Sequence, residues 1–327
     1  MAHILMFLWL VVVSQSIKHE AIMIQDKLMS FPAFEEINYF TASDLWEALS
    51  PTKSFFDEPS NIVYRGQADA EWSLIPSLLR NENLNPLLKF MGRRCTADEL
   101  VFTEICLLEE FSKYCDSIGV RIPNDSMKFR REILSSQVQD RYYIRPELWP
   151  NHELIELMAL AQHHGVPTRL LDWTKQPYVA VYFAVSSAMA NHVNWKDNSK
   201  LAIWVFNTER VGHYQNVKVV QVPGSTSNHV SAQSGLFTVH PHSGHRGGDF
   251  EISGLEYEFS RLPKTPLLKL TLPVTEALSL YRLCLKVGIN AATIYPSADG
   301  AGKAVQDAIY SRIISNKDYD PDINSNL

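Results

Sequence analysis

Residues 162–184 place a short polar segment between two helices, and this arrangement constrains the fold more than any other stretch. The first helix is indicated by apolar residues at helical spacing, namely Leu154, Leu157, Met158 and Ala161. Gly165 ends that helix, and Pro177 suits the first turn of the next one, because proline has no N–H to lose there. The polar segment between them carries Thr168, Arg169, Asp172, Thr174 and Lys175. We expect a rigid corner that holds a ligand, and the alternative is a charged loop closed by an Arg169–Asp172 ion pair.

Composition and charge narrow the class of protein. The 327 residues are 46% hydrophobic and 20% charged, which is typical of one large globular domain or two smaller ones. A net charge of −6 argues against a broad nucleic-acid surface, although it is compatible with a local basic groove. The cysteines, Cys95, Cys106, Cys115 and Cys284, form no CxxC pair. They are typical of thiols in a reducing compartment, so we expect a cytoplasmic protein.

The N-terminus carries a wholly apolar run at residues 4–13. This run is too short to cross a bilayer, which takes about 20 residues, so we expect no transmembrane span. A signal peptide requires a basic residue before its apolar stretch, but no Lys or Arg precedes this run. A poor signal peptide, a peripheral anchor and an upstream start codon remain open, and we favour a true start at Met23 or Met29. Residues 1–22 are therefore expected to be an extension, and residues 315–327 a flexible tail.

Helical patterns dominate the first half of the chain and short apolar strands the second. Further helices are predicted over residues 44–49, 98–114, 127–136, 275–287 and 301–314. Strands are predicted over residues 61–64, 201–206, 217–222, 235–239, 267–272 and 291–295. The sequence therefore predicts a single α+β domain over residues 37–314, with a helical first half and a mixed, mostly antiparallel sheet.

Three local motifs bear on chemistry. Gly300-Ala301-Gly302-Lys303 resembles a fragment of a phosphate loop, but the required earlier Gly is missing and Ala304 stands where Ser or Thr is required, so a turn that starts a helix is favoured. His240, His242 and His245 have no Cys or carboxylate partner at fixed spacing, which favours a solvated loop over a metal site. The sequence contains no GxSxG or HExxH motif and no convincing acidic metal cluster, which argues against a hydrolase triad and a nuclease.

Tyr64-Arg65-Gly66-Gln67 is the most informative short motif. A strand that ends in Arg-Gly places a guanidinium at the edge of a sheet, and we expect the glycine to let a ligand approach the backbone. The planar fork of arginine suits a phosphate or a ribose diphosphate. His163 and His164 end a helix, where a cationic imidazole suits the helix dipole, and one of them is expected to face the ligand.

Taken together, these stretches resemble the FRG domain family, named for a Phe/Tyr-Arg-Gly motif. The matching pieces are Tyr64-Arg65-Gly66, the run from Gln162 to Thr174, the run from Ala232 to Thr238, and Ile294-Tyr295-Pro296 through Asp299-Gly300. The resemblance implies a bacterial or phage-borne cytosolic domain, in a family that is largely without assigned function.

The order of elements is also similar to that of ADP-ribosyltransferases, which implies NAD as the bound nucleotide. Arg65 matches the Arg or His of their first strand, and Thr174 resembles the residue that precedes a helix on their second strand. Their third strand carries a Glu that holds the ribose and stabilises an oxocarbenium-like transition state. Gln233 stands near that position, so Asp172 or Asp299 would have to supply the negative charge.

The sequence-based hypothesis is an FRG domain that binds NAD or a related nucleotide and transfers ADP-ribose. Its catalytic residues would be Arg65, Thr174, Gln233 and Asp172, and its binding residues Tyr64, Gly66, Gln67, His163, His164, Arg169 and Asp299. We expect Arg65, Arg169, Asp172, Thr174 and Gln233 to meet in one cleft. The acceptor, whether protein, nucleic acid or small molecule, stays open. The alternative is a non-catalytic ligand-sensing or interaction domain in phage defence.

Overall fold

The computed structural model describes residues 31–56, 61–80, 95–209, 217–221, 235–260 and 262–317. The strands in this part of the chain form one seven-stranded sheet in the order β1-β7-β4-β2-β3-β6-β5. Their bounds are β1 Glu35–Asn38, β2 Ile62–Gln67, β3 Leu170–Thr174, β4 Lys200–Asn207, β5 Lys218–Val220, β6 Gly235–Val239 and β7 Leu267–Pro273. Only β1 and β7 pair in parallel among the strands described. The prediction of a single α+β domain with a mixed, mostly antiparallel sheet is confirmed.

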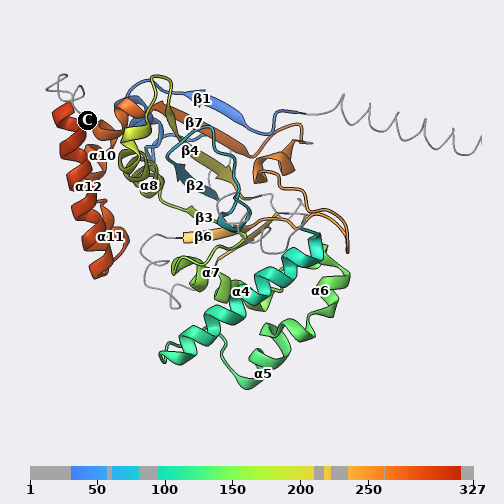
Figure 1. The fold of residues 1–327 in the computed structure, drawn as a ribbon. Coiled ribbons are helices and arrows are strands. Elements are labelled where there is room, and N and C mark those ends of the chain that lie inside the picture. The colour runs from blue at the N-terminus through green and yellow to red at the C-terminus, as the bar shows by residue number, and fades with distance from the viewer. Residues whose placement is uncertain are drawn as a thin grey trace, which may run out of the picture.

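Helices cover this sheet in two groups (Figure 1). Their bounds are α2 Ala42–Ala48, α4 Ala97–Ser117, α5 Met127–Phe129, α6 Asp140–Ile144, α7 Ile155–His163, α8 Pro177–Ala190, α10 Ala277–Lys286, α11 Ala291–Ile294 and α12 Ala298–Lys317. Helices α8, α10, α11 and α12 gather on one side, and α4 to α7 gather below β3 and β6. No helix in the described ranges combines the length and the apolar character needed to cross a membrane.

Strand β4 is apolar on both faces because both faces are covered. Leu201, Ile203 and Val205 pack against α8 and α10, whereas Trp204 and Phe206 belong to a second cluster on the opposite face. A third cluster joins α4 and α7 to β3 and β6. Full burial on both sides explains why β4 is a continuous apolar run, without the alternation of a half-exposed strand.

The glycine of the Tyr-Arg-Gly motif has a packing role. A Cβ atom at Gly66 would lie 2.0 Å from the carbonyl oxygen of Ala180 and 2.8 Å from the backbone nitrogen of Ala184, both in α8. The absence of a side chain therefore lets α8 lie directly on β2. Gly66 also borders the cavity described below, so our expectation that it lets a ligand approach the backbone stays a prediction.

Several predicted elements are confirmed. Helix α4 extends the predicted helix at both ends and begins with a capping box between Thr96 and Glu99. Pro177 is the first residue of α8, and β6 has the predicted bounds. The region predicted as a helix over residues 127–136 divides into α5 and a π-helical turn at Arg130–Leu134. Residues 1–22, as well as residues 318–327 of the expected tail, lie outside the described ranges.

Three elements differ from the prediction. The polar corner between α7 and α8 is strand β3, because Leu170, Leu171 and Trp173 are buried while the strand pairs with β6. Residues 291–295 were predicted as a strand, but they form α11, since Asn290 and Thr293 cap its first turn reciprocally. Strand β1 was not predicted; its four residues are exposed and its pairing with β7 is a tertiary contact.

The sheet divides between β2 and β3. These two strands share one registered pair, Tyr64 with Thr174, whereas β2 pairs with β4 over six positions and β3 with β6 over five. The ladder therefore holds at a single point, the last residue of β3, and the two strands separate from there. This fork is where the candidate site lies.

Candidate functional site

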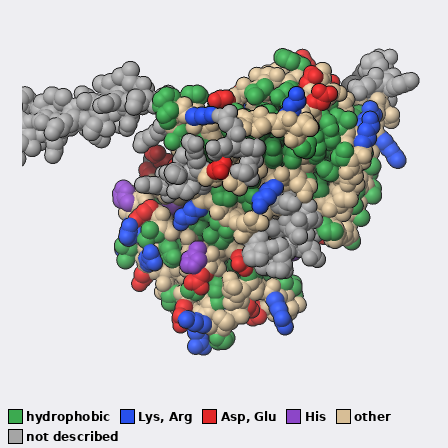
Figure 2. Space-filling model, turned by 180° about the vertical axis from the view of Figure 1, so that it is seen from behind, with side chains coloured by type: hydrophobic (Ala, Val, Ile, Leu, Met, Phe, Trp, Pro, Cys, Tyr) green, Lys and Arg blue, Asp and Glu red, His purple; other side chains and the backbone are tan. Residues whose placement is uncertain are grey.

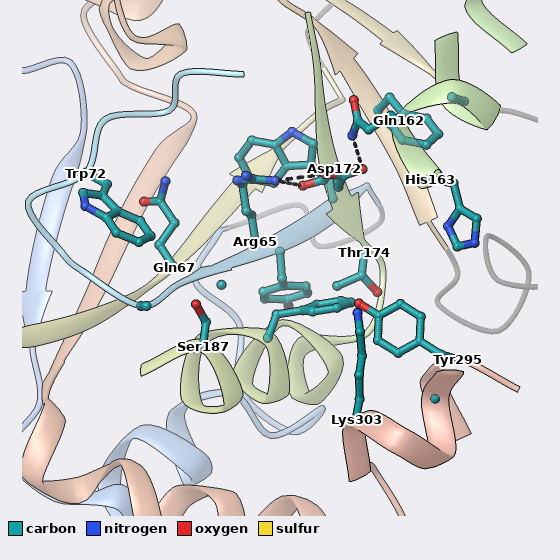
Figure 3. A pocket seen from close by; sticks show the side chains of 18 of the residues that line it. Arg65, Gln67, Trp72, Gln162, His163, Asp172, Thr174, Ser187, Tyr295 and Lys303 are labelled. Atoms are coloured by element: carbon teal, nitrogen blue, oxygen red, sulfur yellow. Dashed lines mark hydrogen bonds and ion pairs between the residues drawn. The ribbon is translucent and has the colours of Figure 1, made fainter. Parts of the chain in front are cut away.

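A cavity of about 620 Å³ lies at the fork between β2 and β3 (Figure 3). Its described walls come from β2, β3, α7, α8 and the start of α12. This volume is within the range of ligand-binding pockets, about 300–1,000 Å³. The motifs on β2 and β3, which are more than a hundred residues apart in sequence, therefore meet around one space.

Arg65 crosses the fork. Its Nη1 atom donates a hydrogen bond of 2.7 Å to the main-chain oxygen of Asp172 and lies 3.6 Å from the Asp172 carboxylate. Its Nε atom is buried and has no hydrogen-bond partner among the described residues. Burial lowers the pKa of Arg65; Asp172 opposes this shift, and the positive charge of Arg80 adds to it. Arg65 thus connects β2 to β3 through Nη1, while its Nε–H keeps an unused hydrogen-bond donor.

Asp172 is held in place by a chain of hydrogen bonds. Gln162 Nε2 donates to Asp172 Oδ1 at 2.6 Å, and the Gln162 carbonyl oxygen accepts from the hydroxyl of Thr168. That hydroxyl oxygen in turn accepts from the backbone N–H of Leu170 at 3.2 Å. The Asp172 side chain is nevertheless 60% exposed. The result is an oriented carboxylate that a ligand can reach.

Thr174 and the start of α12 form the opposite wall. Thr174 is buried, and its Oγ1 atom accepts from the backbone N–H of Gln176 at 3.0 Å, just before α8 begins. Figure 3 places Thr174 facing Tyr295 and Lys303. The ammonium of Lys303 lies 4.2 Å from the centre of the Tyr295 ring, and Asp299 is exposed in the first turn of α12. This wall therefore presents cationic, anionic and aromatic groups together.

Sequence reasoning did not assign several residues that line the cavity: Trp72, Arg80, Gln162, Phe183, Ser187, Phe237, Tyr295 and Lys303. Gln162 and Tyr295 stand inside the quoted motifs, which was an available signal. Burial raises the pKa of Tyr295 to about 12, so its hydroxyl stays protonated at neutral pH. Phe237 also stands inside a quoted motif, whereas Ser187 reaches the cavity only through the packing of α8, which sequence patterns do not reveal.

The binding residues predicted from sequence divide into two groups. Tyr64, Gly66, Gln67, His163 and Asp299 border the cavity. The amide of Gln67 is engaged at both ends, because it accepts from the Trp204 indole at 2.6 Å and donates to the Ser73 carbonyl at 3.3 Å. His164 does not border the cavity; it is exposed and its ring stacks at 6.2 Å on Phe111.

Arg169 does not line the cleft, which corrects the expectation for this residue. Its side chain is fully buried, and its Nε donates to a carboxylate oxygen of Glu104 at 2.7 Å, while Nη2 contacts the other oxygen. Its remaining contacts are the carbonyl of His240 and the Nδ1 atom of His242. The Arg169–Asp172 pair considered for the loop is not formed either. Arg169 instead joins α4 to β3 and to the segment after β6.

His240 and His242 are buried around Arg169, so the solvated loop expected from sequence is wrong for these two residues, whereas His245 is exposed as expected. Burial and then the charge of Arg169 lower the pKa of His240 to about 3 and that of His242 to about 2. Both rings are therefore neutral at pH 7. The described residues contain no group of three or more His, Cys, Asp or Glu able to hold a metal ion.

Of the five residues expected to converge, Arg65, Asp172 and Thr174 meet at the cavity, and Arg169 lies in the core. Gln233 lies outside the described residues.

Comparison with protein families finds one match in this region. Residues 60–192 match the family model described as the FRG domain. This part of the chain is therefore similar to the FRG domain. The match runs from β2 through α8, so it includes both strands of the fork and the helix packed on Gly66. No match was found among curated proteins or among solved structures.

Proposed function

We propose that the FRG domain binds NAD or a related nucleotide in the cavity at the fork and transfers ADP-ribose to an acceptor. The observation that carries the proposal is the meeting of Arg65, Thr174 and the oriented carboxylate of Asp172 around one space of about 620 Å³. These residues come from the two strands where the resemblance to ADP-ribosyltransferases expects the nucleotide.

The cavity walls suit the parts of a dinucleotide. Arg65 and Lys303 offer positive charge to a diphosphate, and the rings of Trp72, Phe183 and Tyr295 offer apolar surface to a base or a nicotinamide. The rings of Phe183 and Tyr295 meet edge to face at 6.2 Å, which makes a defined aromatic wall.

The proposed reaction breaks the bond between the nicotinamide nitrogen and the ribose carbon. The electron pair of that bond leaves with nicotinamide, and the ribose carbon becomes cationic until an acceptor nucleophile bonds to it and loses its proton. The carboxylate of Asp172 would stabilise the developing cation, because its hydrogen bond from Gln162 orients it in advance. Asp299 is the other carboxylate among the described residues of the cavity wall.

A second candidate function is that of a non-catalytic sensor or interaction domain. One observation in its favour is the pairing of Asp172 with Arg65, because the positive guanidinium offsets the negative charge that would stabilise the ribose cation. The other is the lack of any Glu among the described lining residues. A role in bacterial or phage defence belongs to the proposal through the family resemblance alone, and a cytoplasmic location through that resemblance and the cysteine pattern.

Nicotinamide release from NAD tests the proposal, with candidate proteins and nucleic acids as acceptors. We expect turnover by the wild type and a loss of more than tenfold in kcat for Asp172→Asn, which keeps the shape of the side chain but removes its charge. Asp197→Asn is the control, since Asp197 is exposed and away from the cavity. Binding of NAD without release by the wild type would favour the sensor. Equal turnover in both variants would remove Asp172 from the reaction.

A further inference from the structure

A second cavity of about 340 Å³ adjoins the first. The two share four lining residues, Arg65, Arg80, Gln162 and Asp172, so they are parts of one groove that meet beside the Arg65–Asp172 contact. The described lining of the smaller part includes no aromatic ring; it consists of these four residues with Ser77, Gly165, Val166, Pro167 and Leu170. The smaller part therefore offers a base or a nicotinamide no stacking surface.

The described lining of the smaller cavity includes two guanidinium groups, of Arg65 and Arg80, and one carboxylate, of Asp172. Asp172 is already engaged, since Oδ1 accepts from Gln162 and Oδ2 lies 3.6 Å from Arg65. Arg80 directly follows the 3₁₀ turn Ser77–Leu79, and its Nε donates to the Ile75 carbonyl at 3.1 Å, which fixes the direction of its side chain. Its terminal nitrogens make no ion pair with the described residues.

The excess positive charge here contrasts with the rest of the molecule. The chain as a whole carries a net charge of −6, and Lys and Arg alternate with Asp and Glu over the described part of the face in Figure 2. Arg65 and Arg80 are close enough for the charge of one to lower the pKa of the other, so they repel each other in a partly desolvated site. An anion between them would relieve this repulsion.

We infer that the smaller cavity is a phosphate subsite in which Arg80, together with Arg65, binds the diphosphate of the ligand. The inference rests on the proposed function for the identity of that ligand, and its chemistry is that of any small phosphate ester or diphosphate. Two guanidinium forks present paired donors to phosphate oxygens, which is the geometry that favours arginine in such sites. The aromatic part of the larger cavity would then hold the base or nicotinamide ring of the same nucleotide.

Calorimetric titration with inorganic pyrophosphate and with ADP-ribose tests the subsite, and adenosine serves as the phosphate-free control. We expect Arg80→Ala to weaken pyrophosphate and ADP-ribose binding by about ten- to a hundredfold, because it removes a charge-assisted contact, and to leave adenosine binding unchanged. Arg80→Lys should retain part of the affinity. Arg131→Ala is the matched control, since Arg131 is exposed on the turn Arg130–Leu134 and lines neither cavity.

A wild type that binds neither phosphate compound would overturn the inference. Equal losses in Arg80→Ala and Arg131→Ala would do the same, because they would reveal a general effect of charge. Thermal melts check folding, and Arg80→Gln replaces the alanine variant if that variant unfolds. If pyrophosphate binding depends on Arg80 but the wild type releases no nicotinamide, the phosphate subsite stands and the transferase proposal is rejected. If nicotinamide release is unaffected by loss of Arg80, the transferase proposal stands and the phosphate subsite is rejected.

Discussion

At the scale of single residues, Arg65 has a structural and a proposed binding role. Its Nη1 atom reaches the Asp172 carbonyl across the fork, and the rest of the guanidinium borders both cavities. The two roles depend on different properties of the side chain. Positive charge suffices for attraction to an anion, but only the planar fork can bridge the strands and hold a diphosphate simultaneously.

Arg65→Lys separates charge from shape. We expect nucleotide affinity to fall by about five- to a hundredfold, since loss of one arm of a bidentate contact costs about 1–3 kcal/mol. Calorimetric titration of NAD into the folded variant measures this loss, and Arg131→Lys is its control. Unchanged affinity in Arg65→Lys would show that Arg65 does not contact the nucleotide.

The buried histidines predict how stability depends on pH. His240 and His242 have folded pKa values of about 3 and about 2, well below about 6.5 in the unfolded chain. The unfolded state therefore binds more protons below pH 6.5, so the stability that these groups contribute is complete above that pH and is lost as the pH falls toward the folded values. Each histidine contributes a slope of at most about 1.4 kcal/mol per pH unit.

Urea unfolding between pH 7 and pH 5 measures this slope. His242 packs between Arg169 and the Ala97 carbonyl, and Glu104 holds the other side of Arg169. His242→Gln should reduce the slope by about half, because one of two titrating groups is removed. His192→Gln, in the turn His192–Asn194, is the control for replacing a histidine outside this cluster. A stability that stays constant from pH 7 to pH 5 contradicts the burial of both rings as neutral groups.

At the scale of elements, the contact between α8 and β2 positions the cavity. Helix α8 supplies Phe183 and Ser187 to the cavity wall, and Gly66 lets the helix approach β2 closely. Any side chain at Gly66 must push α8 away. The position of the helix and the shape of the cavity are therefore linked through one residue.

Gly66→Ala tests this link. Its Cβ atom would meet backbone atoms of α8, so we expect a loss of about 1–3 kcal/mol in unfolding free energy and a weaker affinity for NAD. Gly302→Ala is the matched control, because no atom beyond its chain neighbours and the backbone of its own helix α12 lies within 4 Å of the added Cβ. Alanine is the better helix former, so the control should gain about 0.5–1 kcal/mol. Denaturant unfolding of both variants compares them directly, and equal effects would contradict the packing role of Gly66.

At the scale of the whole molecule, periodicity predicted the elements whose burial is regular. Helix α4 shows a clear apolar face, and β4 and β6 are short apolar runs between turns, so their positions could be predicted. Strand β3 was not predicted, because the polar residues of its motif interrupt the apolar pattern of the buried Leu170, Leu171 and Trp173. The fold was accessible from sequence, but the pairing that creates the fork was not.

The candidate site was predictable only in part, for the same reason. Arg65, Asp172 and Thr174 stand in motifs that sequence can identify. The partner of Arg169 is Glu104, 65 positions away, and nothing local distinguishes that buried pair from a contact with Asp172. Arg80 follows the 3₁₀ turn Ser77–Leu79 and Lys303 lies in α12, and both reach the groove only through the tertiary arrangement of these segments. Spacing identifies which residues carry chemistry, whereas packing decides which of them share a cavity.

Blocking the cavity is the most direct test of the claim that the fork binds a nucleotide. Ser187→Trp places a large ring on the face of α8 that lines the cavity, whereas Ala190→Trp places the same ring on an exposed position of the same helix. The measurement is the dissociation constant for NAD by calorimetry, with thermal melts to confirm folding. The account predicts at least about tenfold weaker binding for Ser187→Trp and unchanged binding for Ala190→Trp. Wild-type affinity in a folded Ser187→Trp variant would contradict it.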